Sequence, residues 1–316
     1  MRNREKKRML ERMQKCSQTR QEGGLCPRTD LACERALPAV EQEEARIPIR
    51  GEEVCISRRR EQDGGRYVTV ACGHITARDD AAIELLADLL AKEMTIMAKS
   101  VMGKDVSVDT KVFVVGLGNA DMTPDAIGPG TVRRMTATRH LREYDEALFK
   151  SLGCCELSAL APGVMGQTGL ESGDLCRAVS TLLHPDLVVA VDALAARSCE
   201  RLASTVQLSD RGIAPGSGIG NHRMAIDEES MGCPVMGVGV PTVVDSATLV
   251  LDALARAGMD TETLPDDLLA VLESGRSFIV SPRDSDRMVE LTCRLLARAL
   301  DMAFGVGNIF SADCSN

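Results

Sequence analysis

The stretch KVFVVGLGNADMTPDAIGPGTV, residues 111–132, decides the fold class. It opens with a run of apolar, mostly β-branched residues, which is typical of a strand buried on both faces, and then passes through a polar turn into a helix pattern. We expect that helix to span residues 123–141, with Thr123 as its N-cap and a proline in its first turn. A buried strand followed at once by a helix is the unit from which parallel sheets are built.

The same alternation of strand and helix patterns continues along the chain. Strand patterns occupy residues 53–59, 66–72, 154–160, 185–194, 204–209 and 233–241. Helix patterns occupy residues 79–101, 171–183, 193–203, 246–258 and 285–304. The predicted fold is therefore an α/β fold, with a central, mostly parallel sheet that is flanked by helices.

Composition excludes several classes of function. The 316-residue chain has a formal net charge of −9 and only 2% aromatic residues, so we expect no direct nucleic-acid partner. It has no secretory signal and no apolar stretch of about 18 residues, so we expect no membrane span. Its 12 Cys include no CxxC pair, which favours reduced thiols in a cytoplasmic protein.

Basic residues are concentrated at the start of the chain. Residues 1–30 hold nine Lys and Arg against four Asp and Glu. The whole chain has 37 basic and 46 acidic residues, which leaves 28 against 42 for the remainder. A detachable basic leader in front of an acidic body explains this division, and so does a solvated, frayed terminus.

Two aspartates follow buried strands of the predicted sheet. Asp125 comes after residues 111–118, and Asp192 comes after the apolar part of residues 185–194. Each alone could stabilise a helix N-terminus, but on adjacent parallel strands they predict a shared site at the carboxyl edge of the sheet. Such a pair can hold one proton and activate water, or it can bind a divalent metal, and the pattern leaves both chemistries open.

Other motifs have a structural interpretation. VVGLGN has the first two glycines of a dinucleotide fingerprint, but Asp121 stands where the third belongs. GSGIGN, residues 216–221, follows no apolar strand, so both glycine motifs indicate tight turns. Cys72 and His74 are two residues apart, a spacing that on a strand would put them on one face, but neither is at a loop end of the main sheet, which favours a structural role over a nucleophile and base.

Four long motifs together closely resemble the spore germination protease family: VGLGNADMTPDAIGPGTV (115–132), APGVMGQTGLESGD (161–174), VVAVDALAARSCERLASTVQLSDRGIAPGSGIGN (188–221) and PVMGVGVPTVVDSATLVLDAL (234–254). The resemblance implies an α/β fold similar to the hydrogenase maturation proteases. It implies an atypical aspartic-type endopeptidase, made as a zymogen and assembled as a homotetramer, whose substrates are small acid-soluble spore proteins of the spore core. The essential aspartates of the family match Asp125 and Asp192.

The comparison with the family also concerns metal binding and the positions at which this chain differs from the family pattern. The related maturation proteases bind metal with the help of a His, and no His here stands in a matching motif, so no metal ligand is assigned. A metal-assisted maturation-type peptidase and a non-catalytic binding protein on the same scaffold remain the alternatives. His222 stands where Lys is expected, and Asp121 is either a surface carboxylate or a third member of the acidic cluster.

The segment TDLACE, residues 29–34 and here called the cassette, resembles the sequence at which the family cuts its substrates. The match predicts cleavage between Asp30 and Leu31, which separates a basic propeptide (1–30) from a single α/β peptidase domain (31–316). Alternatively, the same residues cap a helix near Leu31. Arg197 and Arg201, spaced i and i+4 on the helix expected after Asp192, are candidates for binding acidic substrate side chains.

Overall fold

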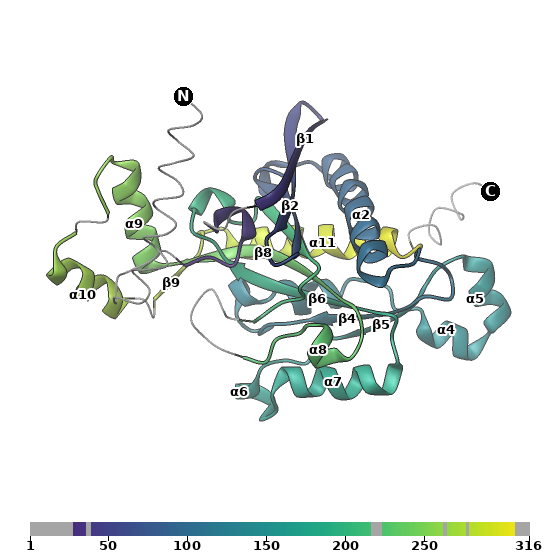
Figure 1. The fold of residues 1–316 in the computed structure, drawn as a ribbon. Helices are drawn as coiled ribbons and strands as arrows, with labels where there is room; N and C mark the ends of the chain where they lie inside the picture. Colours follow the sequence, from purple (N-terminus) through teal and green to yellow (C-terminus); the bar gives the residue numbers. More distant parts are fainter. Residues whose placement is uncertain (1–27, 36–38, 216–222, 262–263, 276–277, 307–316) are drawn as a thin grey trace.

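A mixed nine-stranded sheet forms the centre of the computed structural model, which describes residues 28–35, 39–215, 223–261, 264–275 and 278–306 (Figure 1). The strands are β1 (Ala39–Ile49), β2 (Glu52–Glu61), β3 (Arg66–Ala71), β4 (Lys111–Gly116), β5 (Glu156–Leu160), β6 (Leu187–Ala195), β7 (Thr205–Ser209), β8 (Val235–Asp245) and β9 (Ile279–Val280). Their order is β1-β2-β3-β7-β8-β6-β4-β5, and β9 pairs with β8.

The helices connect and cover these strands. The α-helices are α2 (Asp80–Met102), α3 (Ile127–Val132), α4 (Arg139–Tyr144), α5 (Glu146–Leu152), α6 (Met165–Thr168), α7 (Ser172–Leu183), α8 (Glu228–Met231), α9 (Ser246–Arg256), α10 (Asp266–Gly275) and α11 (Ser285–Ala303). Single 3-10 turns are η1 (Ala32–Glu34), η2 (Ile75–Ala77), η3 (Thr123–Asp125) and η4 (Cys199–Arg201).

The core strands confirm the predicted fold class. Strands β8, β6, β4 and β5 run parallel to one another, whereas β1, β2, β3 and β7 extend the sheet in antiparallel fashion. The sequence pattern did not predict β1, because its residues are mostly polar and exposed and carry little strand signal. It did not predict α10 either.

Two apolar layers sandwich the parallel core. Helices α2 and α11 pack together over one face, where Leu86, Leu90, Leu296 and Leu300 are fully buried. Helices α7 and α8 lie over the other face, against a smaller cluster that includes Phe113 and Val188 (Figure 1). Side chains on both faces of β4 and β6 are therefore buried, which explains their continuous apolar sequence.

The prediction of one long helix over residues 123–141 is wrong. The chain forms η3, then the short helix α3, and then α4 after a break. Gly128 lies so close to β4 that a Cβ on it would come within 2.3 Å of the Leu117 carbonyl oxygen, so the chain is held to the strand instead of continuing one helix axis. Thr123 is not an N-cap, since its hydroxyl donates to Asp286.

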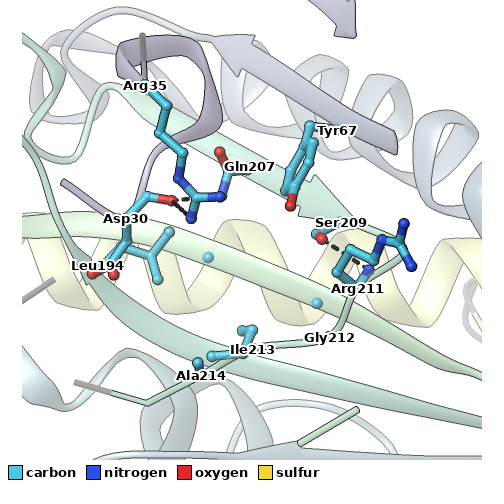
Figure 2. Close-up of a pocket in the computed structure, with 12 residues that line it drawn as sticks. Asp30, Arg35, Tyr67, Leu194, Gln207, Ser209, Arg211, Gly212, Ile213 and Ala214 are labelled. Atoms are coloured by element: carbon cyan, nitrogen blue, oxygen red, sulfur yellow. Dashed lines mark hydrogen bonds between the residues drawn. The ribbon is translucent and has the colours of Figure 1, made fainter. Parts of the chain in front are cut away.

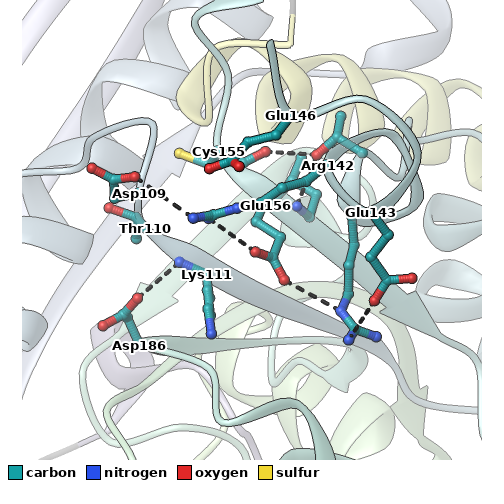
Figure 3. A network of polar contacts seen from close by, with 12 residues as sticks. Asp109, Thr110, Lys111, Arg142, Glu143, Glu146, Cys155, Glu156 and Asp186 are labelled. Atoms are coloured by element: carbon teal, nitrogen blue, oxygen red, sulfur yellow. Dashed lines mark hydrogen bonds and ion pairs between the residues drawn. The ribbon is translucent and has the colours of Figure 1, made fainter. Parts of the chain in front are cut away.

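A polar network ties the strands together at their amino ends (Figure 3). Glu156, the first residue of β5, accepts hydrogen bonds from Arg139 and Arg142 at 3.2 and 3.1 Å. The backbone N–H of Lys111, at the start of β4, donates to Asp186 at 2.8 Å. These groups are paired with one another at the edge opposite Asp125, which leaves the carboxyl edge as the place for chemistry.

Candidate active site

A tight turn after β4 places Asp125 at the carboxyl edge of the sheet. Gly118 has φ +113°, and a Cβ on it would lie 2.0 Å from the Asp125 carbonyl oxygen, so only glycine fits there. The backbone N–H of Asn119 donates to the Asp125 carboxylate at 2.8 Å. The Thr242 hydroxyl, on β8, donates to the Pro124 carbonyl at 2.6 Å and holds this turn against the neighbouring strand.

Asp192 lies within β6, not after it as predicted, because β6 continues to Ala195 through its pairing with β8. Its side chain is only 4% exposed and accepts a hydrogen bond from the backbone N–H of Ala193 at 2.9 Å. Strand β6 is also the parallel neighbour of β4, so the turn that carries Asp125 reaches Asp192. The structure thus brings together the two aspartates that the sequence singled out.

The surroundings of the two carboxyls raise the pKa of both, and that of Asp192 more strongly. Burial raises the pKa of Asp192 well above its ordinary value, the Asp125 charge raises it further, and the Ala193 N–H only partly opposes this. Burial also raises the pKa of Asp125, against the lowering effects of the Asn119 N–H and the Arg223 charge. Both shifts favour the protonated form, and the shift is larger at Asp192, so of the two carboxyls Asp192 is the better place for a proton.

The cassette is docked beside Asp192. The Asp30 N–H donates to the carbonyl of Ala195, and the Ala195 N–H donates back to the Asp30 carboxylate, both at 2.9 Å. Leu31 and Ala32 are fully buried. The Asp30 charge adds, after burial and Asp125, to the raised pKa of Asp192. The Asp30 side chain thus lies within electrostatic reach of Asp192.

Glu34, at the end of the cassette, is bound by the turn that follows β6. Its carboxylate accepts hydrogen bonds from the backbone N–H groups of Arg197 at 2.6 Å and Ser198 at 3.0 Å, and it forms an ion pair with Arg201 at 3.3 Å. The prediction of a helix over residues 193–203 is wrong, because β6 continues to Ala195 and only the short turn η4 follows. Arg197 and Arg201 therefore do not share a helix face. Arg201 binds through its side chain, whereas the contact of Arg197 comes from its main chain.

Gln207, on β7, is a site residue that the sequence pattern did not single out. Its Oε1 accepts from the Ala32 N–H at 2.6 Å, and its Nε2 donates to the Asp30 carbonyl at 3.4 Å. Arg35 donates to the same carbonyl at 3.1 Å. A cavity of about 180 Å³ opens beside these contacts (Figure 2), and its walls include Arg35, Tyr67, Leu194, Gln207, Gly237 and Gly239.

The remaining candidates lie apart from this site. Cys72 is buried, burial raises the pKa of its thiol to about 11, and His74 is exposed, in keeping with a structural role. Asp121 is an exposed loop carboxylate that accepts from Gln167 at 2.7 Å. His222 and the GSGIGN motif lie outside the described residues, as does most of the predicted propeptide.

The described residues form neither a metal-binding cluster nor a membrane-spanning helix. Within residues 28–306, apart from the gaps given above, no group of three or more His, Cys, Asp or Glu is placed to hold a metal ion. In the same part of the chain, none of the helices is both long and apolar enough to cross a membrane. All nine cysteines in the described segments are free thiols.

An α/β sheet with two neighbouring aspartates of raised pKa, and a peptide segment bound next to them, has the parts of a peptidase. The family model for germination proteases matches residues 35–257. The chain belongs to the germination protease family, a family of peptidases that act in germination.

Curated relatives agree with the family match. A germination protease of Clostridium perfringens is 34% identical over 266 residues, covering 76% of this chain and 78% of its own. One from Caldanaerobacter subterraneus is 34% identical over 313 residues, covering 89% and 94%. One from Priestia megaterium is 40% identical over 218 residues, covering 68% and 58%.

A solved structure is matched as well. It is the [NiFe] hydrogenase maturation protease HycI from Thermococcus kodakarensis, with 17% identity, a TM-score of 0.29, and coverage of 59% of this chain and 92% of that one. The fold class is therefore assigned from the sheet topology described above.

Proposed function

We propose that the chain is an endopeptidase made as a zymogen, which cuts itself between Asp30 and Leu31 and then cleaves small acid-soluble spore proteins during germination. The docked cassette is the observation that carries this proposal. A segment that resembles a family cleavage site, with Asp30 in place of Glu before the bond and Cys33 in place of Ser, is bound to β6 by two hydrogen bonds at Ala195, three residues beyond Asp192.

In the proposed mechanism, the two aspartates divide the proton transfers. Asp125 is ionised and takes a proton from the water that adds to the Asp30 carbonyl carbon. Asp192 holds a proton because burial and the Asp125 charge raise its pKa, and it donates this proton to the Leu31 nitrogen as the C–N bond breaks. The products are a carboxyl group on Asp30 and an amine on Leu31.

The turn after β6 supplies a subsite for acidic substrates. The Glu34 carboxylate is bound by two backbone N–H groups and by Arg201. Charge-assisted contacts of this kind recognise a carboxylate by both geometry and charge. A substrate that takes the place of the cassette would present an acidic residue four positions after its cut bond.

The proposal includes a reaction without a metal cofactor, since the two carboxylates suffice for acid and base catalysis. It further includes a homotetramer in the cytoplasm of the spore core, with no direct contact to nucleic acid or membrane. Dialysis against a chelator tests the first point, because a metal-assisted peptidase would lose activity that added divalent metal restores. Size-exclusion chromatography with light scattering tests the assembly.

The decisive experiment follows the N-terminus of the purified full chain by mass spectrometry during incubation at mildly acidic pH. The wild type should lose residues 1–30, and Asp125→Asn and Asp192→Asn should keep them while retaining the wild-type circular dichroism spectrum. An exposed carboxylate on α7 provides the matched control, Asp174→Asn, which should process at the wild-type rate. Normal processing in both site variants would overturn the aspartate assignment, and a new N-terminus far from Leu31 would overturn the cut site.

A further inference from the structure

The side-chain amide of Gln207 binds the main chain of the cassette on both sides of Leu31. Its oxygen accepts from the Ala32 N–H at 2.6 Å, and its nitrogen donates to the Asp30 carbonyl at 3.4 Å. Gln207 is 7% exposed, so these contacts are largely shielded from bulk solvent. Both partners are backbone groups that every peptide substrate has, whatever its side chains.

The sheet register places Gln207 across from Asp192. Gln207 on β7 pairs with Gly239 on β8, and Gly239 pairs in turn with Asp192 on β6. Residues paired across neighbouring strands point to the same face of a sheet, so Gln207 and Asp192 share a face. Between them, β8 presents only the hydrogen of Gly239. A Cβ at that position would come within 2.3 Å of Leu194, which lines the same cavity.

The carbonyl that Gln207 contacts belongs to the bond that the proposed function cuts. Arg35 also donates to this oxygen, at 3.1 Å, but Arg35 follows the cassette in the same bound segment. A separate substrate would bring its own residue to that place. Gln207, in contrast, belongs to the sheet and stays with the enzyme.

We propose that Gln207 is a catalytic residue that stabilises the oxyanion. This inference rests on the proposed function. When water adds to the carbonyl carbon, the C=O electron pair moves onto the oxygen, and the Nε2–H of Gln207 donates to the negative charge that forms there. The Oε1 atom holds the N–H two residues further along and so fixes the amide orientation that aims Nε2 at the carbonyl.

Substitutions at Gln207 can separate its two contacts. Gln207→Glu keeps an oxygen for the Ala32 N–H and, at a pH where the new carboxyl is ionised, removes the donor to the carbonyl. Gln207→Asn keeps an amide but shortens its reach by one methylene. A matched Gln→Glu change at Gln42, an exposed residue of β1 in the same sheet, is the control.

The first-order rate of self-processing in the full chain is the measurement, because the cassette is already docked and the rate reports the chemical step. We expect a loss of about 100-fold in Gln207→Glu, the range seen when one oxyanion donor is removed, and about tenfold or more in Gln207→Asn. Both should melt within a few degrees of the wild type, and Gln42→Glu should process normally. If Gln207→Glu does not fold, Gln207→Asn provides the test.

Wild-type processing in a folded Gln207 variant would overturn this inference. Asp192→Asn is measured beside these variants, so that the two proposals fail differently. If Asp192→Asn is inactive and Gln207→Glu is not impaired, only the role of Gln207 is wrong. If Asp192→Asn processes at the wild-type rate, the role given to Asp192 in the proposed mechanism is wrong, and the inference that rests on it falls with it.

Discussion

The guanidinium of Arg201 lies 3.3 Å from the carboxylate of Glu34, so the turn after the strand that carries Asp192 binds the end of the substrate-like cassette. The same turn adds two backbone N–H groups to that carboxylate. In the proposed mechanism, the site therefore has a reactive part at the two aspartates and a recognition part at the turn, joined by three residues of β6.

Arg201 should set the preference for an acidic residue four positions after the cut bond. We expect Arg201→Gln to reduce the preference for Glu over Gln at that position of a peptide substrate by about fivefold, because a partly exposed ion pair is worth about 1 kcal/mol. The measurement is kcat/KM for the two peptides with each enzyme. Arg177→Gln, which removes an exposed ion pair on α7, is the control, and an unchanged preference in Arg201→Gln would contradict the subsite.

Asp192 should destabilise the fold at neutral pH. Its pKa is raised in the folded state, so between the unfolded and folded pKa values the native chain binds more protons, and the free energy of unfolding falls as the pH rises through that window. We expect Asp192→Asn to melt at a higher temperature than the wild type, with a larger gain at pH 7 than at pH 4. Thermal melts at the two pH values check this, and an equal gain at both would show that Asp192 is not held protonated.

Asp30 should shift the pH dependence of self-processing. Its charge contributes to the raised pKa of Asp192, so Asp30→Asn should let Asp192 lose its proton at a lower pH. The decline of the processing rate on the alkaline side should then move to lower pH. Rates measured at half-unit steps test this, and a shift in the alkaline direction would refute the electrostatic link.

Gly118 should be required both for stability and for the position of Asp125. Gly118→Ala forces a left-handed φ and a contact of 2.0 Å with the Asp125 carbonyl, so we expect a loss of about 2 kcal/mol or more, together with loss of processing. Gly103 also has a positive φ, but nothing lies within 4 Å of its Cβ position. Gly103→Ala should therefore cost about 1 kcal/mol and leave processing intact. Denaturant titrations compare the two, and equal losses would contradict the steric argument.

The sequence predicted the core strands well because their signal is local. The apolar runs of β4 and β6 are buried on both faces, and a chain segment of that composition has few alternatives. The prediction of a helix over residues 193–203 was wrong because helix propensity is only a weak preference, which tertiary contacts can override. Here the chain is instead tied to β8, through the Ala196 N–H to the Val243 carbonyl at 2.9 Å and the Ala203 N–H to the Pro241 carbonyl at 2.8 Å.

The sequence by itself determined the parallel α/β core, the positions of Asp125 and Asp192 toward the carboxyl ends of two core strands, and the cassette around Asp30. These follow from apolar runs, from turn residues and from a motif that can be read along the chain. Tertiary structure alone decided that Gln207 and Asp192 share a face of the sheet, that Glu34 meets Arg201, and which of the two carboxyls is buried more deeply. The physical reason is that β7 pairs with β8 from a distant part of the sequence, and strand register and burial exist only once those strands are joined.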